Sequence, residues 1–287
     1  MPPHGSCRRH RAPQPPPGVR CPRRRLPPSG PHRLRACRTE GRSPPLQQAR
    51  RPGRQLGPSP RSRRCRMILS RARRFIFVHI PKAGGSALAL ALEARARKDD
   101  ILIGDTPKAR SHRAGLRGVK ARGRLWTHST LADIAGLLTD AEIESFFTLT
   151  LVRNPWDRAL RYYLWLRGQS FAHPAVGLAK SLDFSGFLNH PQTQTSFRLW
   201  PASAYMRDRH GVERASLYLR AEHLEEDLPP FEAHLGFRLA PLRRTGDSGP
   251  PQDWRSSYSD ADAALLARLC AEDIGRFHYR FDDAAGR

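Results

Sequence analysis

The sequence lacks long apolar runs and is poor in cysteine. No stretch approaches the roughly 18–20 apolar residues of a membrane span, and no apolar signal-peptide core follows the basic start. After residue 66 only Cys270 remains, so the globular part has no disulfide framework. The other cysteines (Cys7, Cys21, Cys37 and Cys65) show no two-residue ligand spacing, which argues against zinc. We therefore expect a reducing, cytoplasmic location.

Residues 1–66 contain no lysine and a single acid, Glu40. They hold 18 arginines and 15 of the 26 prolines, and their formal charge of +17 leaves only +7 for the rest of the chain. Dense proline and charge of one sign cannot offset the entropy of folding, so we expect a disordered tail. Such tracts can bind nucleic acid or acidic membranes. The missing lysine instead favours translated GC-rich sequence, with Met67 as the native start, no specific nucleic-acid partner, and peripheral membrane contact at most.

Residues 67–287 alternate between strand-like and helix-like segments. This alternation predicts one α/β domain of P-loop-like type, with a central parallel sheet flanked by helices. The expected strands cover 74–80, 101–103, 147–153 and 215–220. The expected helices cover 86–97, 130–138, 140–146, 156–167, 184–188, 194–199, 224–235 and 260–273. A capping box, Thr139-x-x-Glu142, opens the helix at 140–146.

A strand-like run at residues 75–80 ends at a proline, and Lys82-Ala83-Gly84-Gly85-Ser86 then leads into a helix-forming segment. The first amides of a helix lack intrahelical partners, and the helix dipole adds positive potential there. The two glycines let the backbone approach a phosphate, Ser86 offers a hydroxyl, and Lys82 brings a positive charge. This order predicts a phosphate-binding loop.

The loop differs from the P-loop of nucleotide triphosphatases. That motif places lysine directly before the hydroxyl residue, whereas here Gly85 stands at that position. His79-Ile-Pro-Lys-x-Gly-Gly-Ser86 instead resembles the 5′-phosphosulfate loop of sulfotransferases that use 3′-phosphoadenosine-5′-phosphosulfate (PAPS). The resemblance implies that Lys82 through Ser86 hold the phosphosulfate. The alternative is a tight strand-to-helix turn without a ligand.

A second strand-like run ends at Arg153, and Pro155 suits the first turn of the helix that follows. Arg153 thus falls at the carboxyl end of a strand, where ligands collect in open α/β sheets. The run resembles the family's 3′-phosphate motif, an arginine with a serine eight residues on. Here Arg161 replaces that serine, and it either supplies a second charge to the phosphate or points to solvent. Arg158 also fits the motif, or pairs with Asp157 or another carboxylate.

His128 lies between the two phosphate motifs. Transfer to an alcohol needs a group that accepts the hydroxyl proton, and histidine titrates in the right range. The segment His128-Ser-x-Leu-x-Asp133 resembles the one that carries the catalytic histidine in glycan 2-O-sulfotransferases, which implies that His128 is the base. His79 is the alternative, although in the family it belongs to the loop signature. The aromatic residues Tyr162, Tyr163 and Trp165 are expected in the core.

Other segments extend the resemblance over residues 74–283. Residues 252–258 look like a late basic loop that closes over the nucleotide, with Arg255 as a candidate contact or an ordinary exposed arginine. Residues 106–124 contain seven cations and no acid, and Pro107, Gly115 and Gly118 argue against a regular helix there. This segment is either a solvated surface loop or a device that gathers an anionic acceptor beside His128.

The chain is identified as similar to PAPS-dependent sulfotransferases, of the bacterial type that modifies carbohydrates. The resemblance implies in-line transfer to a hydroxyl of a saccharide or glycolipid, with PAP as product and no metal. Lys82 would neutralise charge on the leaving phosphate oxygen. A small-molecule kinase would share the fold but would need magnesium and ATP, and no convincing magnesium carboxylate is evident. A non-catalytic nucleic-acid-binding protein would explain the tail but neither phosphate motif.

Overall fold

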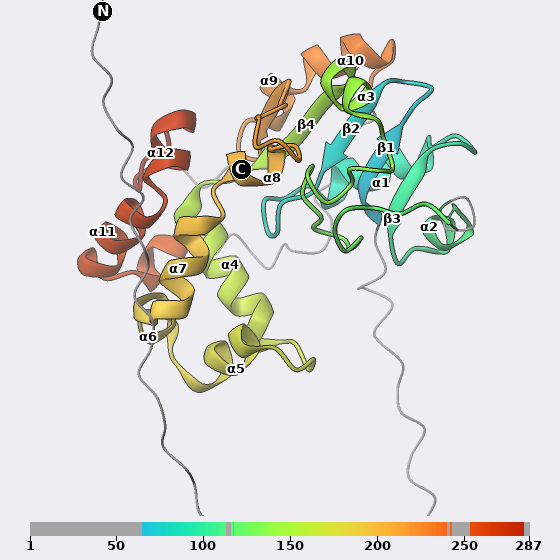
Figure 1. Ribbon diagram of the computed structural model, residues 1–287. Helices are drawn as coiled ribbons and strands as arrows, with labels where there is room; N and C mark the ends of the chain where they lie inside the picture. Colours follow the sequence, from blue (N-terminus) through green and yellow to red (C-terminus); the bar gives the residue numbers. More distant parts are fainter. Residues whose placement is uncertain (1–64, 113–115, 117, 240–241, 243–252, 284–287) are drawn as a thin grey trace, which may run out of the picture. The chain divides into compact units, whose positions relative to one another are not determined.

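In the described part of the chain, five strands form one sheet in the order β3-β1-β2-β4-β5 (Figure 1). The computed structural model describes residues 65–112, 116, 118–239, 242 and 253–283, so the expectations for residues 1–64 lie outside it. The strands are β1 (Cys65–Ser70), β2 (Phe75–Val78), β3 (Ile101–Gly104), β4 (Phe147–Val152) and β5 (Leu217–Arg220). The predicted α/β class is confirmed. β2, β4 and β5 run parallel, whereas β1 is antiparallel to both of its neighbours.

The strand β1 was not predicted, because its first residues continue the arginine-rich composition of the tail. It forms a hairpin with β2 through a tight turn in which Arg74 takes a φ of +52°. Ile68 pairs with Phe77, and Met67 is fully buried. β1 therefore crosses the expected domain boundary between residues 66 and 67.

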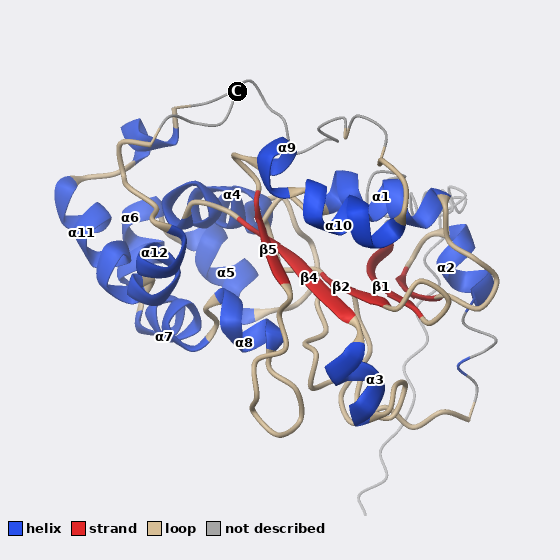
Figure 2. Cartoon of the chain, turned by 90° about the horizontal axis from the view of Figure 1, so that it is seen from above, coloured by secondary structure: helices blue, strands red, loops and turns tan. Residues whose placement is uncertain are grey.

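Helices cover both faces of the sheet. Their bounds are α1 (Ser86–Ala94), α2 (Pro107–His112), α3 (Asp140–Ser145), α4 (Pro155–Arg167), α5 (Pro174–Ser181), α6 (Phe184–Asn189), α7 (Pro191–Leu199), α8 (Ala202–Met206), α9 (Leu224–Asp227), α10 (Pro229–Leu235), η3 (Trp254–Ser257), α11 (Asp260–Leu269) and α12 (Ala271–Phe277). Figure 2 shows α1 and α10 on one face of the sheet and α3 and α8 on the other. In Figure 2 α5, α6, α7, α11 and α12 gather on the side of the sheet where β5 lies.

The helix predicted at 130–138 is wrong, because that segment consists of turns. Thr130 and Asp133 bond to each other's backbone amides at 2.8 and 3.2 Å, and such local side-chain bonds compete with a helical ladder. The amide of Leu131 donates to the carbonyl of Tyr205 instead of to its own turn. Gly136 has a φ of +97°, and a Cβ there would collide with the carbonyl of Lys120. Tertiary contacts thus override the local helical pattern.

Two other predicted helices, at 224–235 and 260–273, are each divided into two shorter ones. Pro229 separates α9 from α10, because proline lacks the amide that would continue the first helix. Cys270 separates α11 from α12. The capping box of α3 is confirmed, since Thr139 and Glu142 each bond the other's backbone amide.

The core encloses β2, the strand that leads into the predicted phosphate loop. Every residue of β2 is buried on both faces of the sheet, as expected for a central strand. Phe231 of α10 packs against Phe75 and Phe147, with ring centroids 5.3 and 5.5 Å apart. Among the described residues no helix has the length and apolar character needed to cross a membrane.

Candidate active site

The loop between β2 and α1 presents an open helix N-terminus. Gly85 is the N-cap of α1, and among the described residues no side chain caps it. The first turn, which begins at Ser86, contains no acid, so its amides have neither an intrahelical acceptor nor a carboxylate partner there. Lys82 adopts a φ of +62°, which is uncommon for a residue with a side chain. The loop can therefore accept an anion at its backbone.

Neighbouring side chains lie so close to the loop that neither Gly84 nor Gly85 has room for a side chain. A Cβ on Gly84 would lie 2.8 Å from Nη2 of Arg153, and its φ of +91° disfavours any other residue. A Cβ on Gly85 would lie 3.0 Å from Cδ2 of His79 and 3.1 Å from Cζ of Phe77. The loop consequently packs directly against the Arg153 guanidinium.

Arg153 follows β4 directly, as Pro155 at the start of α4 predicts. The side chain of Asn154 caps α4 by accepting from the amide of Trp156 at 3.1 Å. Because β2 and β4 are parallel neighbours, their carboxyl ends bring Arg153 beside the loop. Its Nη1 donates to Asp157 Oδ2 at 2.9 Å, while its Nε is buried without a hydrogen-bond partner among the described residues. A buried donor of this kind points to a ligand.

Arg161, in α4, is joined to Arg153 through Asp157. Its Nε donates to Oδ1 of Asp157 at 2.7 Å, so one carboxylate joins the two guanidinium groups. Sequence reasoning considered Asp157 only as a partner of Arg158 and missed its bonds to Arg153 and Arg161, although opposite charges at i, i+4 spacing are a recognisable signal.

Arg158, in the first turns of α4, contacts the backbone of the loop. Its Nε donates to the carbonyl of Pro81 at 3.2 Å, and its Nη1 lies 3.8 Å from Asp273 Oδ2. Burial raises the pKa of Asp273, and the positive charge of Arg158 opposes that shift. Arg158 thus pairs with a carboxylate, but with Asp273 and not with Asp157.

His128 contacts the loop through its ring. Nδ1 of His128 lies 2.9 Å from the carbonyl oxygen of His79 and 3.2 Å from Nδ1 of that residue. Because a carbonyl only accepts, the shorter bond requires the proton on Nδ1 of His128. The basic nitrogen of the neutral ring is then Nε2.

Two tryptophans flank these residues. Trp165 of α4 lies under Lys82, whose Nζ is 5.2 Å from the ring centroid. Trp126 contacts His128 edge to face at 5.1 Å and keeps half of its surface exposed. Sequence reasoning placed Trp165 in the core and did not single out Trp126.

Arg255 is held by the carboxyl-terminal segment. Its Nε donates to the carbonyl of Phe281 at 3.1 Å and its Nη1 to Asp253 at 3.0 Å. Its guanidinium also lies 4.6 Å from the ring centroid of Trp254. Trp254 lines a cavity of about 280 Å³ together with Asn154 and Asp157, but Arg255 is not among the residues that line it.

The basic segment 106–124 is partly helical, which corrects the expectation of an irregular loop. Pro107 does not interrupt α2, because it occupies the first position, where the amide has no role. Lys108 donates to the carbonyl of Glu93 at 2.6 Å. Arg113, Gly115 and Arg117 lie outside the described residues. The remaining exposed cations are Arg110, Lys120, Arg122 and Arg124.

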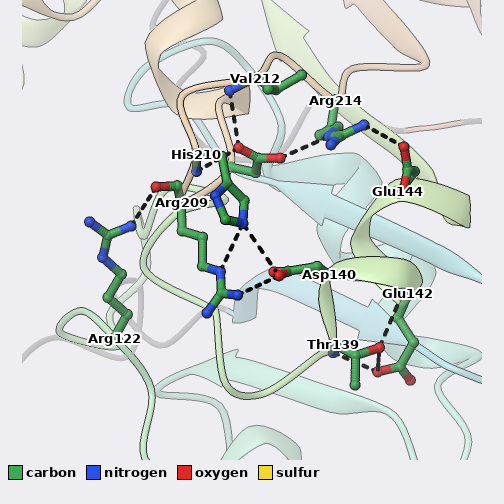
Figure 3. A network of polar contacts seen from close by, with 10 residues as sticks. Arg122, Thr139, Asp140, Glu142, Glu144, Arg209, His210, Val212 and Arg214 are labelled. Atoms are coloured by element: carbon green, nitrogen blue, oxygen red, sulfur yellow. Dashed lines mark hydrogen bonds and ion pairs between the residues drawn. The ribbon is translucent and has the colours of Figure 1, made fainter.

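A polar network anchors the chain that leads to His128 (Figure 3). Arg122 donates to the carbonyl of Arg209 at 2.8 Å, and Arg209 donates to Asp140 of α3 at 2.5 Å. Asp208 accepts from Arg214 Nε at 2.8 Å and from the amide of His210 at 2.8 Å. Burial alone would raise the pKa of Asp208, but these hydrogen bonds outweigh it and hold that pKa below its usual value.

Comparison with solved structures gives a distant likeness. No protein-family model and no curated protein matches the chain. A solved structure that does match is mouse sulfotransferase SULT7A1 complexed with PAP, at 16% sequence identity and a TM-score of 0.36. The match covers 70% of this chain and 82% of that one.

Proposed function

We propose that this chain is a PAPS-dependent sulfotransferase. The observation that carries the proposal is the Arg153 guanidinium, whose Nε is buried without a partner among the described residues while its Nη2 faces Gly84 of the loop. Nε and Nη2 together form the edge that binds phosphate with two parallel hydrogen bonds. An open helix N-terminus and an unsatisfied arginine edge, side by side, fit a nucleotide with phosphates at two positions.

The residues present match the two phosphate groups of PAPS. The amides of Gly85 and Ser86 would hold the 5′-phosphosulfate, together with Lys82, Ala83 and Gly84. Arg153 and Arg161 would hold the 3′-phosphate, Arg161 replacing the serine of the family motif. Arg255 would stabilise the carboxyl-terminal segment and would not bind a phosphate itself, since its donors already bond Phe281, Asp253, Asp282 and Asp283.

PAPS, when bound, supplies an activated sulfuryl group on its 5′-phosphate. His128 accepts the proton of the acceptor hydroxyl at Nε2, because its Nδ1 is fixed by the carbonyl of His79. Lys82 stabilises the negative charge that develops on the departing phosphate oxygen. Trp165 limits the positions open to the Lys82 ammonium through its ring face. Transfer is in line, and no step requires a metal.

The acceptor is a hydroxyl-bearing saccharide. Two observations favour this class over a small apolar alcohol. The half-exposed indole of Trp126 beside His128 offers a flat apolar surface for the C–H face of a sugar ring. The exposed cations Lys120 and Arg124 precede it in the chain and would attract acidic groups on a glycan.

A thermal-shift screen with PAP, with ATP and magnesium, and with duplex DNA tests the proposal. Binding to the native state raises the unfolding temperature, so PAP should stabilise the chain more than ATP or DNA at equal concentration. Stabilisation only by ATP with magnesium would assign a kinase, and stabilisation only by DNA would assign a nucleic-acid-binding protein.

A further inference from the structure

We infer that Asp157 is a positioning residue that joins Arg153 and Arg161 into one anion receptor. The inference rests on the proposed function in taking the natural anion to be the 3′-phosphate of PAPS. It assigns a role to a carboxylate that contacts no reacting atom and acts through the two arginines.

The geometry places one carboxylate between two guanidinium groups. Oδ2 of Asp157 accepts from Arg153 Nη1 at 2.9 Å, and Oδ1 accepts from Arg161 Nε at 2.7 Å. The exposed fractions of the three side chains are 14% for Arg153, 13% for Asp157 and 30% for Arg161. Charged hydrogen bonds with so little access to water hold side chains more firmly than surface ion pairs do.

The choice of atoms matters for ligand binding. Asp157 takes only Nη1 of Arg153, so it leaves the Nε–Nη2 edge for another acceptor. Nε is buried without a hydrogen-bond partner among the described residues, and burial of an unsatisfied donor is costly. The fold therefore satisfies Nη1 and leaves Nε without an acceptor. This arrangement orients Arg153 toward a ligand beside Gly84.

The charges also favour this arrangement. Two guanidinium groups repel each other, and without a counter-ion between them each would turn toward water. Asp157 offsets one of the two charges, so the cluster keeps a net charge of about +1 and remains attractive to a phosphate dianion. The replacement of a serine by Arg161 adds one cation, and Asp157 is the group that accommodates it.

A purely structural role gives a different expectation. Asp157 lies in the first turn of α4, where any carboxylate stabilises the helix dipole. Loss of that effect would lower the stability of the fold without changing which nucleotide it prefers. Asp262 provides a matched control, because it is a buried first-turn carboxylate of α11 whose partners are Ser259, Ser185 and Asn189.

The test is the preference for PAP over adenosine 5′-phosphate, which lacks the 3′-phosphate. Calorimetric titration of the full chain, Asp157→Asn and Asp262→Asn should show PAP binding about tenfold weaker in Asp157→Asn alone, the scale of a lost charged hydrogen bond. Affinity for adenosine 5′-phosphate should stay within about twofold in all three. Equal losses for both nucleotides, or tighter PAP binding in Asp157→Asn, would overturn the inference.

Inorganic phosphate separates this inference from the proposed function. If the unmodified chain does not bind PAP, the proposed function fails, but the receptor can still be tested by thermal unfolding with phosphate. We expect phosphate to stabilise the unmodified chain and Asp262→Asn by the same increment, and Asp157→Asn by less. An equal increment in all three proteins would mean that Asp157 does not organise an anion receptor.

Discussion

The Nδ1 atom of His128 lies 2.9 Å from the carbonyl oxygen of His79, at the start of the loop that precedes α1. The contact joins residues 49 positions apart and fixes the tautomer of the candidate base. It also ties the orientation of that base to the loop proposed to hold the sulfuryl donor.

His128→Asn should lower turnover by about 10²–10⁴-fold, the range that general base catalysis contributes. The asparagine amide can still donate to the carbonyl of His79, so PAP affinity should stay near that of the unmodified chain. Steady-state transfer assays and calorimetry measure the two quantities. If His128→Asn keeps full turnover while His79→Asn loses it, His79 is the base instead.

Gly84→Ala should weaken PAP binding and destabilise the fold. The new Cβ would lie 2.8 Å from Nη2 of Arg153 and would displace the guanidinium from the loop. Gly211→Ala is the matched control, because Gly211 also has a positive φ, +80°, but a Cβ there meets no atom within 4 Å. Both variants should lose about 1 kcal/mol through backbone strain, and only Gly84→Ala should lose PAP affinity by titration. Equal PAP affinities in the two variants would contradict the close packing of loop and arginine.

Lys82→Ala should abolish sulfuryl transfer and leave the fold intact, because Lys82 lies in a loop, is only partly buried and contacts Trp165 through its Nζ. Lys180→Ala, at an exposed position of α5, serves as the control for removal of one charge. Circular dichroism checks the fold and a PAPS-dependent assay the turnover. Near-normal turnover of Lys82→Ala would mean that Lys82 has no part in sulfuryl transfer.

Asp208→Asn should destabilise the chain by roughly 1–3 kcal/mol at neutral pH, since it breaks a buried, charged hydrogen-bond cluster. The hydrogen bonds hold the pKa of Asp208 below its usual value, so the carboxylate contributes stability above its unfolded-state pKa and loses it as pH falls through the folded-state pKa. The stability difference between the two proteins should therefore shrink as pH is lowered below about 4.

Denaturant unfolding at a series of pH values measures that difference for Asp208→Asn. Asp99→Asn, at an exposed position, should show little difference at any pH. If the difference in unfolding free energy between Asp208→Asn and the unmodified chain stays constant from neutral to acid pH, the carboxylate charge does not stabilise the 207–214 loop.

Local chemistry made part of this structure predictable. The capping box of Thr139 and Glu142 involves neighbouring residues only, and α3 begins where it predicts. Pro155 likewise fixed the junction of β4 and α4, and with it the place of Arg153 at a strand end. Parallel pairing then implied that Arg153 and the loop share one edge of the sheet, which the structure bears out.

Features set by distant contacts were not predictable in the same way. The turns at 130–138 depend on contacts with Tyr205 and Lys120. The sequence pattern within 130–138 contains no information about those contacts. The bond between His128 and His79 depends on the path of the intervening chain. Asp157 is an intermediate case, because its spacing from Arg153 and Arg161 was visible but its atom-by-atom pairing was not.

A crystal structure of the chain with PAP tests the central claim most directly. We expect the 5′-phosphate within hydrogen-bond distance of the Gly85 and Ser86 amides, and the 3′-phosphate on the Nε–Nη2 edge of Arg153. PAP bound elsewhere, or with Arg153 Nε still lacking an acceptor, would contradict the proposal that this site holds the sulfuryl donor.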